Sequence, residues 1–156
     1  MKKQHIGLLG LAGSGKDTAA RALLERGWQR VGFADAIKTK AYFLGWDGLK
    51  DERGRRLLQD LGMAMRQFDE NFWIHKAQNS MKGGPCVFTD VRFQNEADFI
   101  RGEGGIIVRV VRPWLKVGEH ESESGQLRIH SDQSIINDGS IEHLHAQLLA
   151  IAGGNL

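Results

Sequence analysis

The sequence predicts an α/β fold with three layers, in which helices cover both faces of a parallel sheet. Short apolar runs of strand length alternate along the chain with segments whose apolar residues recur every three or four positions. A glycine-rich turn directly follows the first of these runs, as is common where a strand leads into a helix. No internal repeat or second core is evident in the sequence, so residues 1–156 are expected to form a single domain.

The glycine-rich turn follows a strand expected over about residues 5–11. Residues 10–16, Gly-Leu-Ala-Gly-Ser-Gly-Lys, have the spacing G-x-x-x-x-G-K, and a helix is expected over about residues 16–26. Small residues let the backbone turn its N–H groups inward, and Lys16 adds positive charge at a helix N-terminus that already favours anions. The turn, called the P-loop below, therefore predicts a nucleoside triphosphate site lined by Gly13, Ser14, Gly15, Lys16, Asp17 and Thr18.

The residue after the lysine departs from the commonest form of this motif. Many P-loops carry a Ser or Thr there that binds Mg²⁺, whereas this chain has Asp17 and places the hydroxyl one residue later, at Thr18. Small-metabolite kinases of the adenylate kinase type often lack the first hydroxyl, hold Mg²⁺ through water and use the later Thr on the α-phosphate side.

The next elements are a strand, a helix and a helical pair. A strand is expected over about residues 28–33, and the helix after it is expected to be capped by Asp35 and to end near Gly45. Residues 55–81 have a helical period that is interrupted at 68–71, which predicts two helices meeting there.

The second half of the chain completes the alternation. Residues 86–91 indicate a buried parallel strand, residues 94–102 a helix, and residues 105–112 the most β-branched strand of the chain. Residues 114–132 are polar and lack a steady period, so we expect a functional loop there, most simply a lid. A strand at 134–136 and an amphipathic helix close the chain, with Ile141, Leu144, Leu148 and Ile151 facing inward.

Composition restricts the functional classes. Charged residues make up 26% of the chain, and the formal net charge of +2 is too small to indicate a nucleic-acid partner. Cys86 is the only cysteine, which excludes a disulfide within the chain and favours a buried thiol. Neither a signal-peptide core nor an apolar run near the roughly 18 residues of a membrane span is present in the sequence. We expect a cytoplasmic protein without nucleic-acid or membrane partners.

Polar residues follow each predicted strand, at the sheet edge where ligands of open parallel sheets bind. Beyond the P-loop, these residues are Asp35 and Lys38, Asp90 and Arg92, Arg109 and Arg112, and Asn137 and Gly139. Phosphates, basic groups and a carboxylate for a metal would thus meet at one edge. Phosphoryl transfer requires such an arrangement, because its catalysis is mostly alignment and charge neutralisation.

Each of these residues also has a plainer interpretation. Asp90 suits Mg²⁺, directly or through water, and equally the N-cap of the helix that follows; the two roles are compatible. Arg92 suits bidentate binding of a phosphate, or it is a surface arginine. Lys38 and Arg66 are solvated helix charges unless they line a second-substrate pocket with Asp69 and Trp73.

With these residues in view, the chain resembles the bacteriophage-type deoxynucleoside monophosphate kinases. Matching blocks lie in the family's order across nearly the whole chain, at residues 14–18, 33–38, 56–62, 72–73, 89–97, 110–113, 120–123 and 136–140. The most specific are the Asp-x-Arg-x-x-x-Glu block from Asp90 to Glu96 and the block Asn137-Asp138-Gly139.

The resemblance implies a P-loop kinase fold with a short polar lid at about 114–132, ATP as donor, Mg²⁺, and a deoxynucleoside 5′-monophosphate as acceptor. It implies that Lys16 binds the β- and γ-phosphates, that Arg112 lies near the adenine or the moving phosphoryl group, and that Asn137 and Gly139 line the adenine side. For a phage-encoded chain the compartment would be the host cytoplasm, and a homodimer is implied by the resemblance alone.

On the acceptor side the resemblance implies a larger set of residues. Lys38, Arg66 and Arg92 would face the acceptor phosphate, with Lys16, Arg66, Asp90 and Arg92 as the catalytic group. The remaining expected contacts of the acceptor nucleotide are Asp35, Trp73, Glu96 and the lid residues His120, Ser122 and Glu123.

Two alternatives remain open from the sequence. The same fold serves kinases of other phosphorylated metabolites, such as dephospho-coenzyme A or phosphomevalonate. The second alternative is a nucleotide-binding module without turnover, although it would leave the acceptor-side basic residues without a role.

Overall fold

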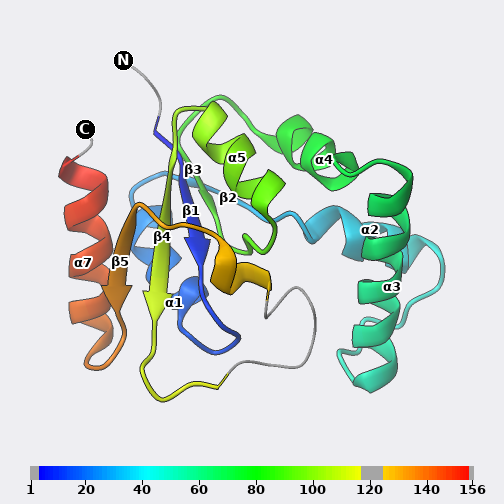
Figure 1. The fold of residues 1–156 in the computed structure, drawn as a ribbon, viewed down its shortest axis with the longest axis horizontal. Helices are drawn as coiled ribbons and strands as arrows, with labels where there is room; N and C mark the ends of the chain where they lie inside the picture. The colour runs from blue at the N-terminus through cyan, green and yellow to red at the C-terminus, as the bar shows by residue number, and fades with distance from the viewer. Residues whose placement is uncertain (1–3, 117–124, 155–156) are drawn as a thin grey trace. The chain divides into compact units, whose positions relative to one another are not determined.

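A computed structural model describes residues 4–116 and 125–154, and its strands form a five-stranded sheet (Figure 1). The strands are β1 (Ile6–Leu9), β2 (Gln29–Val31), β3 (Cys86–Phe88), β4 (Ile106–Val111) and β5 (Gln133–Ile136). Their order across the sheet is β2-β3-β1-β4-β5. Strand β1 pairs in parallel with β3 and β4, and β4 pairs in parallel with β5, which confirms the predicted parallel sheet.

The helices follow the predicted pattern closely. They are α1 (Lys16–Leu24), α2 (Asp35–Phe43), α3 (Glu52–Phe68), α4 (Phe72–Ser80), α5 (Gln94–Gly102) and α7 (Ile141–Gly154), with a 3₁₀ turn η1 at Gln126–Arg128. The predicted break between α3 and α4 is confirmed. Within the described ranges, each helix is too short or too polar to cross a membrane.

The chain divides into two compact units. Unit 1 consists of residues 1–30 and 82–156 and carries the P-loop, most of the sheet and helices α1, α5 and α7. Unit 2 consists of residues 31–81 and carries α2, α3 and α4.

The core of unit 1 lies on both faces of β1. Ile6 and Leu8 belong to a buried apolar cluster with residues of α1 and α7, among them Leu23, Leu144 and Leu148. Between them, Gly7 faces α5, where an added Cβ would lie 2.6 Å from Cδ1 of Ile100. Helix α5 can therefore pack directly on β1 only because this position has no side chain.

Unit 2 is a small helical cluster held around Trp73. The indole Nε1–H of Trp73 donates to the carbonyl oxygen of Gly62 at 3.0 Å, and its ring contacts Phe72 edge-on at 4.7 Å between centroids. Gly54 lies in the first turn of α3, where a Cβ would collide with the carbonyl oxygen of Leu49. These contacts join α3 to α4 and to the loop before α3.

Three local expectations were wrong. The N-cap of α2 is Ala34, so Asp35 is the first helical residue and not the cap. Helix α3 begins at Glu52, ahead of the periodic pattern from 55. Of the two interpretations of residues 50–56, a solvated connection or the first turn of this helix, the solvated connection is wrong, because Oδ1 of Asp51 accepts the N–H of Gly54 and caps the helix there. Ile141 is 53% exposed, and Ala152 instead is buried on the inner face of α7.

Candidate functional site

The P-loop adopts the sharp turn that its glycines allow. Gly13 and Gly15 have φ angles of 79° and 101°, in the left-handed region that residues with a Cβ rarely adopt. Gly15 is the N-cap of α1, and no side chain of the described residues caps this helix end. The first N–H groups of α1 therefore form the kind of helix terminus that binds phosphate.

Three side chains from distant parts of unit 1 hold the backbone of the P-loop. The amide of Gln126 donates to the carbonyl oxygen of Gly10 at 2.9 Å and accepts its N–H at 3.0 Å. Further along the loop, Arg112 Nη1 donates to the Gly13 carbonyl oxygen at 3.1 Å, and Asn137 Nδ2 to that of Ser14 at 2.9 Å. These carbonyl oxygens, which would repel a phosphate, are thus bound by donors from the surrounding protein.

Lys16 begins α1 and is half-buried. Its ammonium group donates to the carbonyl oxygen of Gly10, so in this structure the side chain folds back along the loop that it follows. An ammonium held at the base of the loop lies close to where the phosphates of a nucleotide would be bound.

Asn137 and Gly139, which are predicted to line the adenine side, follow the end of β5 at Ile136. The backbone N–H of Asn137 donates to the carbonyl oxygen of Val111 at 2.7 Å, which fixes its position beside β4. A Cβ at Gly15 would collide with Nδ2 of Asn137. The close approach of Asn137 to the P-loop therefore requires glycine at position 15. Gly139, also predicted here, is exposed two residues further on.

Asp90 and Arg92 follow β3, the strand that pairs with β1. Both are half-buried, and Asp90 lies two residues beyond the last residue of β3. Because β1 and β3 are parallel neighbours, Asp90 is at the same sheet edge as the P-loop. The N-cap of α5 is Phe93, so the alternative in which Asp90 caps this helix is wrong.

Glu96 has a role in the backbone that the sequence did not indicate. It is only 4% exposed, and its Oε1 accepts the N–H groups of Arg92 at 3.2 Å and Phe93 at 3.0 Å. This carboxylate closes the first turn of α5 in the manner of a capping box. Contact between Glu96 and an acceptor nucleotide stays a prediction.

The other acceptor-side candidates belong to unit 2. Asp35 and Lys38 are half-buried in the first turns of α2, and Arg66 is half-buried near the end of α3, with Nη1 3.9 Å from Sδ of Met63. Trp73 is 3% exposed and is part of the core of this unit. That these four residues line an acceptor pocket stays a prediction.

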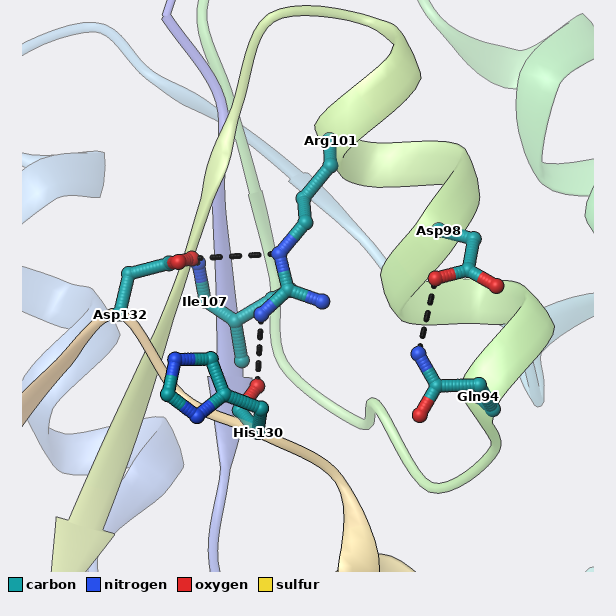
Figure 2. Close-up of polar contacts among 6 residues, drawn as sticks. All are labelled: Gln94, Asp98, Arg101, Ile107, His130 and Asp132. Atoms are coloured by element: carbon teal, nitrogen blue, oxygen red, sulfur yellow. Dashed lines mark hydrogen bonds and ion pairs between the residues drawn. The ribbon is translucent and has the colours of Figure 1, made fainter.

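The segment expected to form a lid is described only in part. His120, Ser122 and Glu123 lie outside the described residues. From η1 onward the chain is attached to unit 1. Arg109 Nη2 donates to the carbonyl oxygen of Ile129 at 2.6 Å. Figure 2 shows the second bond, in which Arg101 Nη2 donates to the carbonyl oxygen of His130 at 2.6 Å. This part of the predicted loop is built into unit 1.

Asp132 completes that attachment. Its Oδ2 accepts the N–H of Ile107 on β4 at 2.7 Å and lies 3.4 Å from Nε of Arg101 on α5 (Figure 2). Burial lowers the pKa of Arg109, but a guanidinium keeps its charge in the neutral range. Two charged arginines therefore fix the segment that carries Gln126.

Gln126 is the site residue that sequence reasoning missed. It lies in a polar stretch without periodicity, and its neighbours Leu127 and Arg128 are exposed. Nothing in such a pattern distinguishes a buried glutamine from a solvated one.

Within the described residues, no group of three or more His, Cys, Asp or Glu side chains gathers as a metal site. Mg²⁺ beside a nucleotide is usually held by one or two carboxylates, phosphate oxygens and water. A single strand-end carboxylate such as Asp90 fits that donor set.

Comparison with known proteins places the chain in a family. The profile of the family described as deoxynucleotide monophosphate kinase matches residues 51–148, more than half of the chain. A protein of Acanthamoeba polyphaga mimivirus, assigned by name to the deoxynucleotide monophosphate kinases, is 33% identical over 93% of this chain and 94% of its own length. The deoxynucleotide monophosphate kinase of Escherichia phage RB69 is 33% identical over 60% of this chain and 42% of its own length.

Solved structures show the same fold at much lower identity. Shikimate kinase from Aquifex aeolicus superposes with a TM-score of 0.56 at 14% identity, over 97% of both chains. Together with the parallel sheet and the P-loop, this likeness confirms the α/β fold of P-loop kinases. The family profile matches more than half of the chain, and the mimivirus relative matches it along nearly its full length. The chain therefore belongs to the deoxynucleotide monophosphate kinase family.

Proposed function

We propose that this protein transfers the γ-phosphoryl group of ATP to a deoxynucleoside 5′-monophosphate, giving the diphosphate and ADP. The observation that carries the proposal is the P-loop in a chain of this family. Its carbonyl oxygens are bound by Gln126, Arg112 and Asn137, and the helix that it opens has no side-chain cap among the described residues. A polyphosphate supplies the negative charge that such a helix end attracts.

On the donor side, residues 13–18 would hold the phosphates of ATP, with the Lys16 ammonium on the β- and γ-phosphates. Arg112 and Asn137, which already contact the P-loop, would lie towards the adenine and the moving phosphoryl group with Gly139. Asp90 would hold Mg²⁺ directly or through water. When bound, Mg²⁺ neutralises charge on the transferring group.

On the acceptor side, Arg92 would bind the acceptor phosphate with Lys38 and Arg66 from unit 2, and Asp35 would be a further contact of the acceptor nucleotide. Glu96 supports this role because its carboxylate holds the backbone N–H of Arg92. Trp73 would act through the packing of unit 2, since its ring is buried there. His120, Ser122 and Glu123 would close over the nucleotide as part of the lid.

The proposal is tested by following ADP release with a panel of deoxynucleoside monophosphates, with dephospho-coenzyme A and phosphomevalonate as competing acceptors. We expect at least one deoxynucleotide to accelerate ATP consumption and the other metabolites to leave it at the basal rate. If only one of the other metabolites accelerated ATP consumption, that metabolite would be the acceptor and the proposed substrate would be wrong. ATP binding without acceleration by any acceptor would favour a non-catalytic module.

Lys16→Ala is expected to lower kcat by about a hundredfold or more, because it removes the positive charge at the moving phosphoryl group. The matched control is Lys82→Ala, which removes an exposed lysine in unit 1 outside the proposed site. Loss of turnover in both variants would mean that the assay follows general damage rather than the P-loop.

Arg92→Ala is expected to raise the KM of the acceptor and to lower kcat, while ATP affinity stays within about twofold of wild type. A bidentate charged contact to one phosphate contributes about 1.5–3 kcal/mol, which predicts a roughly tenfold to hundredfold loss of kcat/KM for the acceptor. An unchanged acceptor KM would make Arg92 a surface residue.

A further inference from the structure

The side-chain amide of Gln126 pairs with the backbone of Gly10 in the P-loop, in the way that the backbone of a neighbouring strand would. Its side chain is fully buried, and its amide makes two hydrogen bonds to one residue 116 positions away. The N–H of Gly10 donates to Oε1 at 3.0 Å, and Nε2 donates to the Gly10 carbonyl oxygen at 2.9 Å. This pair of bonds fixes the orientation of the amide, since the reversed amide would set donor against donor and acceptor against acceptor.

The carbonyl oxygen of Gly10 has a second donor, the ammonium group of Lys16. Gly10 is buried at the end of β1, where water does not replace a lost donor. If Lys16 were its only partner, moving the ammonium onto a phosphate would leave a buried acceptor unpaired, which opposes the movement. With Gln126 in place, the acceptor stays paired when Lys16 leaves.

We propose that Gln126 is a positioning residue for Lys16: it keeps the Gly10 carbonyl hydrogen-bonded while the ammonium moves to the phosphates of a bound nucleotide. The inference rests on the proposed function only in taking a nucleoside triphosphate as the ligand of the P-loop. It predicts that Gln126 affects nucleotide binding through Lys16 and leaves the acceptor side untouched.

Charged side chains of unit 1 bind the backbone around Gln126. Nη2 of Arg109 donates to the carbonyl oxygens of Gln126 at 3.4 Å and of Ile129 at 2.6 Å. Arg101 and Asp132 then fix the following residues to α5 and β4 (Figure 2). The backbone that carries Gln126 is thus held by charged side chains of β4 and α5.

The experiment compares Gln126→Met with wild type by calorimetric titration of Mg·ATP in the absence of any acceptor. Methionine keeps the length of the side chain but makes neither strong hydrogen bond. We expect Kd for Mg·ATP to rise about tenfold, the cost of one buried acceptor left unpaired, with the acceptor KM unchanged in the kinase assay.

The matched control is Gln147→Met. The amide of Gln147 makes the same two bonds to Ile136 on β5, accepting its N–H at 2.9 Å and donating to its carbonyl oxygen at 2.8 Å. This variant loses the same two bonds, but at the exposed residue Ile136, away from Gly10 and Lys16. We expect a lower melting temperature and an unchanged Kd for Mg·ATP.

If the methionine variant does not fold, Gln126→Glu tests the proposed role of Gln126 instead. The ionised carboxylate accepts the N–H of Gly10 but has no hydrogen for the Gly10 carbonyl oxygen, whereas the protonated form has one. Its affinity for Mg·ATP relative to wild type at the same pH should therefore improve as the pH falls.

Two results would overturn the inference: a Kd in folded Gln126→Met equal to that of wild type, or a Gln126→Glu deficit that does not change with pH. Failure of the proposed function is recognised separately. If wild type binds Mg·ATP, the methionine variant binds it more weakly and no deoxynucleotide is phosphorylated, the role of Gln126 stands and the proposed function falls.

Discussion

Gly13, Gly15 and Gly27 share a left-handed backbone but differ in what a side chain would meet. Their φ angles are 79°, 101° and 85°. A Cβ at Gly27 would have no heavy atom within 4 Å among the described residues, and one at Gly13 would reach only the side chain of Leu115, at 3.9 Å or more. At Gly15 it would collide with the Asn137 amide that holds the Ser14 carbonyl oxygen. Position 15 thus combines backbone strain with a functional contact.

Gly15→Ala is therefore expected to destabilise the fold more than Gly27→Ala. Both variants place a Cβ in the left-handed region, at a cost of about 1–2 kcal/mol in the free energy of unfolding. Only Gly15→Ala also displaces Asn137, so it should cost more than its control and weaken Mg·ATP binding as well. Urea unfolding and calorimetric titration measure the two effects. Equal destabilisation with equal nucleotide affinity would show that Asn137 moves aside without consequence.

At the scale of elements, helix α5 follows β3 along the chain and packs on β1 within unit 1. Its inner face carries the buried residues Ala97 and Ile100, and the latter packs over Gly7 of β1. Its first turn is closed by Glu96, which sequence reasoning assigned to the acceptor nucleotide. The periodic pattern predicted the helix correctly, but it did not show that the cap lies at Phe93 or that Glu96 accepts two backbone N–H groups.

Glu96→Ala is expected to lower the free energy of unfolding by about 1–2 kcal/mol, the usual loss for a removed helix cap. Glu96→Gln keeps an oxygen that accepts the same N–H groups, so it should retain most of that stability. Asp98→Ala, which removes an exposed carboxylate bound to Gln94 at 2.8 Å, serves as the control (Figure 2). Thermal unfolding of the three variants gives the comparison. A stability loss as large in Asp98→Ala as in Glu96→Ala would mean that the loss does not arise at the cap.

At the scale of the whole molecule, the alternation of strands and helices could be predicted because each element has its own periodicity. The positions at the sheet edge could be predicted as far as they depend on strand ends, as with the P-loop, Asp90 and Asn137. Contacts that join segments far apart in the chain could not be predicted from the sequence. The pairing of Gln126 with Gly10 depends on how residues 126–132 are attached by Arg101 and Arg109, and no local pattern encodes that attachment.

The two compact units differ in the size of their cores. In unit 1 a buried cluster spans the sheet and helices α1 and α7. The buried apolar side chains of unit 2 are fewer, namely Val31, Phe33, Ile37, Ala41, Trp73, Ile74 and Ala77, whereas Phe43 and Phe68 are 88% and 80% exposed. Since less buried apolar surface means less free energy opposing local opening, unit 2 is expected to open before unit 1.

Native-state hydrogen exchange tests this difference when wild type is compared with Trp73→Phe. The substitution removes the indole N–H that donates to the Gly62 carbonyl oxygen and should cost about 1 kcal/mol. We expect amides of α2, α3 and α4 to lose protection while those of β1 and β4 keep theirs, because unit 2 opens without unfolding the sheet. Trp114→Phe, at a residue 61% exposed in unit 1, should change neither set. Equal loss of protection in β1 and in α3 would mean that residues 31–81 open only when the whole chain unfolds.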